Sequence, residues 1–146
     1  MIERIPQRGK TDCTICAVAM VMGHPYNYER VLRDSEKYPK ISEEGKFYGW
    51  WETYLRDEDF LIEYRPFMEL YRLPQYRGQV AGLLMFDIPH IKYSHIVAVD
   101  ELGIIDPADN MPPHLDIPEY VLGRISQGAV FHKEFLAVAD SKTATY

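Results

Sequence analysis

The sequence predicts an α+β domain in which N-terminal helices pack on an antiparallel sheet. Apolar residues follow helical spacing in the first third of the chain, and from Phe60 onward they occur in short runs typical of strands. Helices that come before the strands, instead of alternating with them, favour an antiparallel sheet. The chain contains no internal repeat and no linker, so we expect residues 1–146 to form a single domain.

Composition and charge exclude several functional classes. Of the 146 residues 47% are hydrophobic and 26% are charged, which is typical of a soluble globular protein. The net charge is −6 and Lys and Arg are not clustered, which argues against a nucleic-acid partner or an anionic membrane surface. The chain lacks a bilayer-length apolar run and a signal peptide, so we expect a cytoplasmic protein.

Three helices are predicted in the first part of the chain. Thr11 and Asp12 are good N-cap residues for the first, and Gly23 follows its last turn. The second begins at Asn27 or Tyr26 and is amphipathic. The third has a stripe of bulky aromatic residues, which is more typical of a core than of a ligand site. The predicted helices span residues 13–22, 26–38 and 47–55.

Strand patterns dominate the rest of the chain. The continuous apolar run at 80–86 is typical of a central strand, and the runs at 94–99 and 103–105 form a hairpin around a turn at 100–103. Residues 117–122 are expected to form a helical turn. The predicted strands span residues 60–64, 80–86, 94–99, 103–105 and 129–138.

Cys13 is the candidate nucleophile. A helix N-terminus favours the thiolate form of a cysteine, but a thiol nucleophile also needs a base from elsewhere in the fold. His95 opens an apolar strand, and pairing within the hairpin would bring Asp106 alongside it as the acceptor that orients the ring. Gln7, six residues before Cys13, could donate an N–H to an oxyanion together with the Cys13 backbone amide.

These residues, in this order, resemble the papain-like cysteine peptidases. The most similar group is the peptidase C39-like group, which includes the bacteriocin-processing domains. The matching motifs are Gln7, Asp12-Cys13, Cys16-Ala17-Val18-Ala19-Met20, Ser94-His95-Ile96-Val97-Ala98-Val99 and Ile105-Asp106-Pro107. The resemblance implies the papain-like fold for the predicted α+β domain. Residues 38–79 have no counterpart in this pattern.

The resemblance also implies an activity, that of a cysteine hydrolase cleaving a peptide or amide bond in a peptide or protein substrate. It implies Cys13 as nucleophile, His95 as general base, Asp106 as orienting residue and Gln7 as oxyanion donor, with neither cofactor nor metal. The chain departs from the family at Thr14, where a glycine is usual. A β-branched side chain there could crowd the approach of a substrate.

Two other interpretations remain. Cys13 and Cys16 form a Cys-x-x-Cys pair, which can mark a redox or zinc site. The chain lacks a strong strand before the pair and has scattered histidines, so we expect Cys16 to be a buried apolar residue. The second alternative is a catalytically silent papain-like module that binds or inhibits a protein, which Thr14 and the many tyrosines favour.

Overall fold

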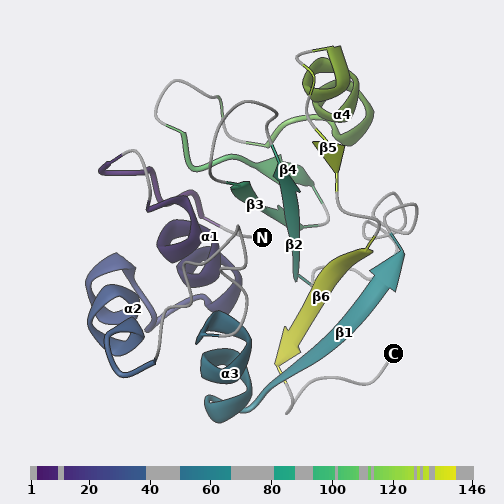
Figure 1. Cartoon of the computed structure of the whole chain (residues 1–146). Coiled ribbons are helices and arrows are strands. Elements are labelled where there is room, and N and C mark those ends of the chain that lie inside the picture. Colours follow the sequence, from purple (N-terminus) through teal and green to yellow (C-terminus); the bar gives the residue numbers. More distant parts are fainter. Residues whose placement is uncertain are drawn as a thin grey trace.

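A computed structural model of the chain has the predicted mixture of helices and antiparallel sheet (Figure 1). The structure describes residues 3–9, 12–38, 50–66, 81–87, 94–100, 102–108, 112, 114–126, 128, 130–131 and 134–140. The helices are α1 (Cys13–Met22), α2 (Tyr28–Ser35), α3 (Trp50–Asp57) and α4 (Ile117–Ser126). The strands are β1 (Phe60–Pro66), β2 (Ala81–Asp87), β3 (Ser94–Asp100), β4 (Gly103–Ile105), β5 (Val130–Phe131) and β6 (Glu134–Asp140).

The strands form one sheet in the order β1-β6-β2-β3-β4, and β5 pairs with β2. All of its pairs are antiparallel, as predicted. Strand β2 lies between β6 and β3, and its Leu83, Leu84 and Phe86 side chains are fully buried. The prediction of a central strand is therefore confirmed, although residue 80 lies outside the described part.

The prediction of one final strand at 129–138 is wrong, because two strands occupy that segment. Strand β5 pairs Phe131 with Phe86, whereas β6 pairs Leu136 with Leu83. Between these two pairs β2 has two residues and the other segment has four (84–85 against 132–135), so the register changes by two. The two strands thus pair with β2 in different registers.

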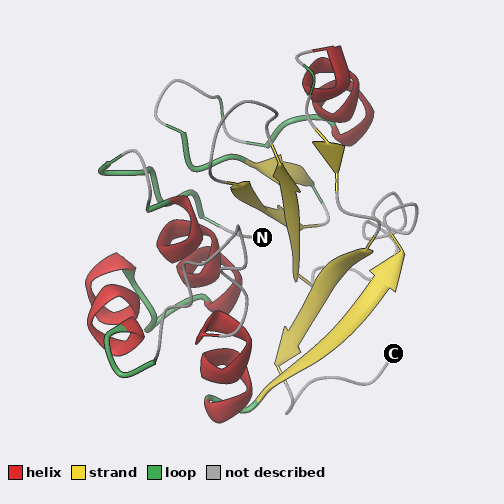
Figure 2. Cartoon of the chain, viewed as in Figure 1, coloured by secondary structure: helices red, strands yellow, loops and turns green. Residues whose placement is uncertain are grey.

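Helix α1 is the centre of the core. It begins and ends where the sequence predicts and packs on β3 and β2 on one side and on α2 on another (Figures 1 and 2). The small residues Cys16, Ala17 and Ala19 are completely or almost completely buried, which lets the helix approach the sheet closely. Within the described residues, no helix is long and apolar enough to span a membrane.

The other helices differ from prediction at their ends. Helix α2 begins after Asn27, whose side chain accepts a hydrogen bond from the Arg30 N–H at 2.9 Å, and it ends three residues before Tyr38. Helix α3 runs two residues beyond Leu55, and the predicted residues 47–49 lie outside the described part. The turn predicted at 117–122 is a helix of ten residues, α4, which continues through Gly123 despite its low helix propensity.

Candidate active site

The β3–β4 hairpin brings His95 and Asp106 together. Ala98 pairs with Ile105, so the next residue, Asp106, comes opposite Val97 and diagonal to His95. The His95 Nε2 atom lies 2.8 Å from Asp106 Oδ1. Because the carboxylate is an acceptor, this distance indicates that Nε2 carries the hydrogen and donates it.

Asp106 is fully buried and accepts four hydrogen bonds. In addition to His95, Oδ1 accepts the Ala108 backbone N–H at 2.9 Å. Oδ2 accepts the Tyr120 hydroxyl at 2.8 Å and the Arg124 Nη2 at 2.9 Å, both from α4. Burial alone would raise the pKa of Asp106, but the hydrogen bond and charge of His95, followed by the bonds from the Ala108 N–H and the Tyr120 hydroxyl, lower it to about 2. The carboxylate is therefore ionised and held in one orientation.

The His95 ring is mostly buried, with 12% of its side chain exposed. It packs against the edge of the Phe86 ring on the neighbouring strand, with the ring centroids 5.2 Å apart. Burial lowers the pKa of His95, but hydrogen bonds to Asp106 and to Cys13 outweigh it and raise the pKa to about 9. Since Nε2 faces Asp106, the ring nitrogen left for the Cys13 sulfur is Nδ1.

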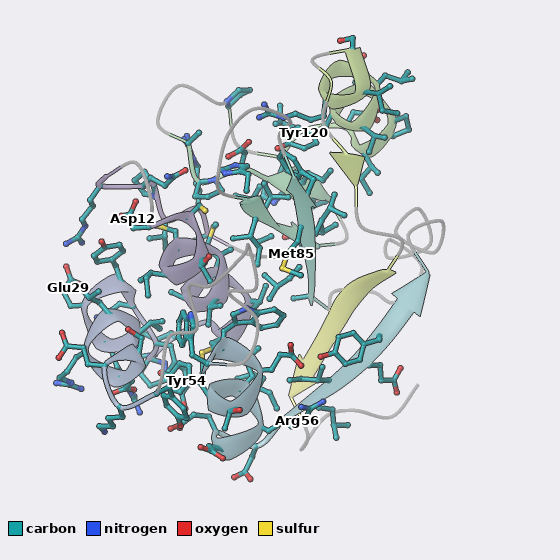
Figure 3. All side chains as sticks on the ribbon, in the orientation of Figure 1. Asp12, Glu29, Tyr54, Arg56, Met85 and Tyr120 are labelled. Atoms are coloured by element: carbon teal, nitrogen blue, oxygen red, sulfur yellow. The ribbon has the colours of Figure 1, made fainter. Side chains whose placement is uncertain are left out.

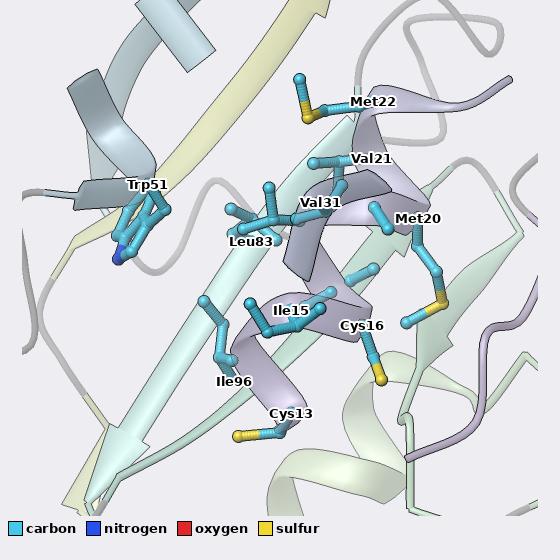
Figure 4. Close-up of a cluster of buried hydrophobic side chains, with 14 of the residues drawn as sticks. Cys13, Ile15, Cys16, Met20, Val21, Met22, Val31, Trp51, Leu83 and Ile96 are labelled. Atoms are coloured by element: carbon cyan, nitrogen blue, oxygen red, sulfur yellow. The ribbon is translucent and has the colours of Figure 1, made fainter. Parts of the chain in front are cut away.

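Cys13 is the first residue of α1, and 4% of it is exposed. Its sulfur points away from that of Cys16, as Figure 4 shows, so the two thiols of the Cys-x-x-Cys pair face different surroundings. The Cys16 thiol is fully buried and lies 3.5 Å from the Pro6 carbonyl oxygen. Cys16 is thus part of the core, as the sequence predicts, while Cys13 meets His95.

Asp12 does not cap α1 in the way the sequence predicts, and Thr11 lies outside the described part. The Asp12 carboxylate makes no capping bond to the helix. Instead, it accepts the backbone N–H groups of Arg8 at 2.9 Å and Gly9 at 3.1 Å and the Tyr28 hydroxyl at 2.8 Å. It therefore orders the loop that carries Gln7, and the Asp12 side chain leaves the helix N-terminus at Cys13 uncapped.

Gln7 lies close to the hairpin, since its backbone N–H donates to the Pro107 carbonyl oxygen at 2.6 Å. Its side-chain Nε2 donates to the Gly9 carbonyl oxygen at 3.1 Å. The backbone of Gln7 is thus fixed next to the residue that follows Asp106. The side-chain amide is bonded within its own loop.

Sequence reasoning missed Tyr120 and Arg124, which join Asp106 from α4 (Figure 3 shows Tyr120 where α4 approaches the sheet). Their spacing of four residues places them on one face of a helix, and this was the available signal.

Thr14 is half-buried next to Cys13 in the first turn of α1. In the part of the chain that the structure describes, no three His, Cys, Asp or Glu side chains come together as a metal site.

The fold is that of the peptidase C39 domains. One similar structure is a double glycine motif protease from an AMS/PCAT transporter in complex with the leader peptide. It has a TM-score of 0.60 and 17% identity, over 96% of this chain and 92% of that one. Another is the peptidase domain of Streptococcus ComA, a bifunctional ABC transporter of a quorum-sensing pathway. It has a TM-score of 0.63 and 14% identity, over 95% of this chain and 98% of that one. No protein-family model matches the sequence, and neither does any curated protein.

Proposed function

We propose that this chain is a cysteine peptidase, with Cys13 as nucleophile, His95 as general base and acid, and Asp106 as the residue that orients His95. The observation that carries the proposal is the 2.8 Å contact between His95 Nε2 and the buried Asp106 carboxylate, which leaves Nδ1 of the same ring for Cys13, a residue that helps to raise the pKa of His95. A thiol, an imidazole and an oriented acceptor in sequence are the groups that acyl transfer through sulfur requires.

In the first half of the reaction, His95 takes the Cys13 proton and the sulfur attacks the carbonyl carbon of the scissile bond. The carbonyl oxygen becomes an oxyanion in the tetrahedral intermediate. The His95 imidazolium then gives its proton to the leaving nitrogen as the carbon–nitrogen bond breaks. The amine departs, and the acyl group remains on Cys13 as a thioester.

In the second half, His95 takes a proton from water and the hydroxide attacks the thioester carbon. Collapse of the second oxyanion breaks the carbon–sulfur bond, and His95 returns the proton to the departing sulfur. The acid product leaves and the thiol is restored.

We assign the oxyanion site to the Cys13 backbone N–H and the Gln7 side-chain amide. The Cys13 amide belongs to the first turn of α1, where N–H groups have no partner within the helix. The Gln7 Nε2 group would have to exchange the Gly9 carbonyl oxygen for the substrate oxyanion. On this assignment the Gln7 side chain turns toward the site when substrate binds.

We propose a peptide as the substrate. The similar domain in complex with a leader peptide supports this class, and its description as a double glycine motif protease suggests peptides containing that motif as the first to try. A peptide mixture that includes such sequences, incubated with the wild-type protein and analysed by mass spectrometry, would reveal the cleavage site. Cys13→Ala should leave every peptide intact.

Selective alkylation tests the nucleophile without knowledge of the substrate. Iodoacetamide at neutral pH should label Cys13 well before Cys16, and Cys16→Ala should react as fast as the wild type. His95→Ala should slow labelling strongly, because the thiol loses the group that takes its proton. Labelling of Cys13 at the rate of an ordinary thiol, unaffected by His95→Ala, would overturn the proposal and favour a silent binding module.

A further inference from the structure

The Asp106 carboxylate is bonded to more groups than the orientation of His95 requires. Its Oδ2 atom faces away from His95 and accepts both the Tyr120 hydroxyl and the Arg124 guanidinium. An ionised carboxylate has about four acceptor positions, and here all are used, two on each oxygen. Helix α4 thus competes with His95 for the electron density of the same buried carboxylate.

Cys13, His95, Asp106 and Arg124 follow one another as a row of side chains, and their charges can alternate in sign. When the Cys13 proton is on His95, the order is thiolate, imidazolium, carboxylate and guanidinium. Arg124 places a positive charge 2.9 Å from Asp106 Oδ2, and 20% of its side chain is exposed. Among the described residues, the titratable and charged side chains that contact His95 or its acceptor are Cys13 of α1, Asp106 after β4, and Tyr120 and Arg124 of α4.

Aromatic packing fixes the geometry of the row. The Arg124 guanidinium lies over the Tyr120 ring at 4.9 Å and over the Phe86 ring at 5.4 Å, measured to the ring centroids. The Phe86 ring in turn meets His95 edge-on. Burial and the neighbouring Asp106 charge raise the pKa of Tyr120, so its hydroxyl keeps its proton and remains a donor.

We propose that Tyr120 and Arg124 are positioning residues that act on His95 through Asp106. They hold the carboxylate in place and draw part of its charge toward Oδ2, which keeps the imidazolium acidic enough to give up its proton. The role in catalysis rests on the proposed peptidase function, while the coupling itself is a property of the described side chains. A general acid works best when its pKa lies near the working pH. The pKa of His95 is already about 9, so any further rise would slow protonation of the leaving amine.

The experiment is an NMR titration of His95 in the full chain labelled at histidine, with the resonance assigned by His95→Gln. In Arg124→Met a cation leaves the neighbourhood of the imidazolium, so the His95 midpoint should rise by about one pH unit. Arg124→Lys keeps the charge and should restore most of the wild-type midpoint. Tyr120→Phe removes one neutral donor and should give a smaller rise.

Leu122→Ala is the matched control, because Leu122 is an exposed residue of the same helix and its removal should leave the midpoint unchanged. A structural role of α4 alone would lower the melting temperature of the Arg124 variants without raising the midpoint. An unchanged midpoint in Arg124→Met, or a fall toward 6.5, would overturn the proposal. If Arg124→Met does not fold, the rise in Tyr120→Phe decides in its place.

The same samples test the peptidase function separately. Iodoacetamide labelling of Cys13 reports on the nucleophile, whereas the NMR titration reports on the coupling between α4 and His95. A raised midpoint with an unreactive Cys13 would reject the peptidase function and retain the coupling. A reactive Cys13 with an unchanged midpoint would retain the peptidase function and reject the coupling between α4 and His95.

Discussion

In the described part of the chain, two histidines are bonded to buried aspartates, and the two pairs lie at opposite ends of one strand. His95 Nε2 lies 2.8 Å from Asp106 Oδ1, and His114 Nε2 lies 3.1 Å from Asp100 Oδ2. Both aspartates are at most 1% exposed. Each also accepts the backbone N–H of the residue two positions later, Ala108 and Leu102 respectively. The two pairs therefore use the same kinds of bond, although Asp106 accepts both on Oδ1 and Asp100 accepts one on each oxygen.

Their surroundings differ. His95 is the second residue of β3 and lies next to Cys13, the first residue of α1, whereas Asp100 is the last residue of β3, about 17 Å further along the strand. Asp106 is bonded to Arg124 and Tyr120 of α4. Asp100 instead lies where β3 ends before the turn to β4, and His114 precedes Leu115, which forms a β-bridge with Ile104 of β4. A histidine bonded to a buried aspartate is thus not enough to indicate a reactive site, and the proposal for His95 depends on Cys13 next to its ring.

The largest expected effect separates the two pairs by the reactivity of Cys13. At pH 6 an isolated thiol is only a fraction of a percent ionised, so His95→Gln should slow alkylation of Cys13 by about 100-fold. His114→Asn should leave the rate within about two-fold of the wild type. Iodoacetamide labelling at pH 6, followed by mass spectrometry of the Cys13 peptide, measures both.

Asparagine is the matched replacement at position 114 because the residue has a φ of 48°, a conformation that asparagine tolerates better than most residues. A comparable loss of Cys13 reactivity in His114→Asn would break the distinction between the pairs. It would mean that the segment holding His114 determines the position of Asp106.

A second prediction uses the pH dependence of stability. The folded protein raises the pKa of His95 from 6.5 to about 9, so the stabilisation is fully present below pH 6.5 and is lost as the pH rises through 9. The shift corresponds to about 3 kcal/mol of unfolding free energy. Urea unfolding at pH 6 and pH 10 should show that the wild type loses about this much more stability than His95→Gln.

Asp106 should make stability depend on pH in the opposite direction, at the acidic end. Its pKa is lowered to about 2 from 3.8, so its stabilisation is present above pH 3.8 and is lost as the pH falls through 2. If His95→Gln showed the same loss between pH 6 and pH 10 as the wild type, the imidazolium would not be held by Asp106 and Cys13 in the folded state.

The parts of the site that the sequence predicted depend on short-range structure. Helix α1 follows from its own apolar pattern and from Gly23 after it, with a φ of 72°. The approach of Asp106 to His95 follows from a hairpin whose strands are separated by a short turn. Both could be read from neighbouring residues, because pairing across a tight turn fixes the register.

The parts that the sequence did not predict depend on partners far away in the chain. The last turn of α4 follows Gly123, and Arg124 within it contacts Asp106, 18 residues earlier. The break between β5 and β6 arises from their register against β2, about fifty residues before them. The Asp12 carboxylate is a local exception, because it bonds the N–H groups of Arg8 and Gly9 in the preceding loop, and a capping pattern does not distinguish these from the helix N–H groups.

The smallest prediction concerns the stability contributed by the second pair. His114→Asn removes a hydrogen bond to a buried carboxylate, but 22% of the His114 side chain is exposed, so water can replace part of the bond. We expect a loss of about 1 kcal/mol in the free energy of urea unfolding at pH 7. Cys13 alkylation measured in the same samples should not change. Unchanged stability would show that the His114–Asp100 bond makes no net contribution to the free energy of unfolding. Burial and a hydrogen bond would then not be enough to infer a stabilising contribution from either pair, and only the pH dependence of unfolding would measure it.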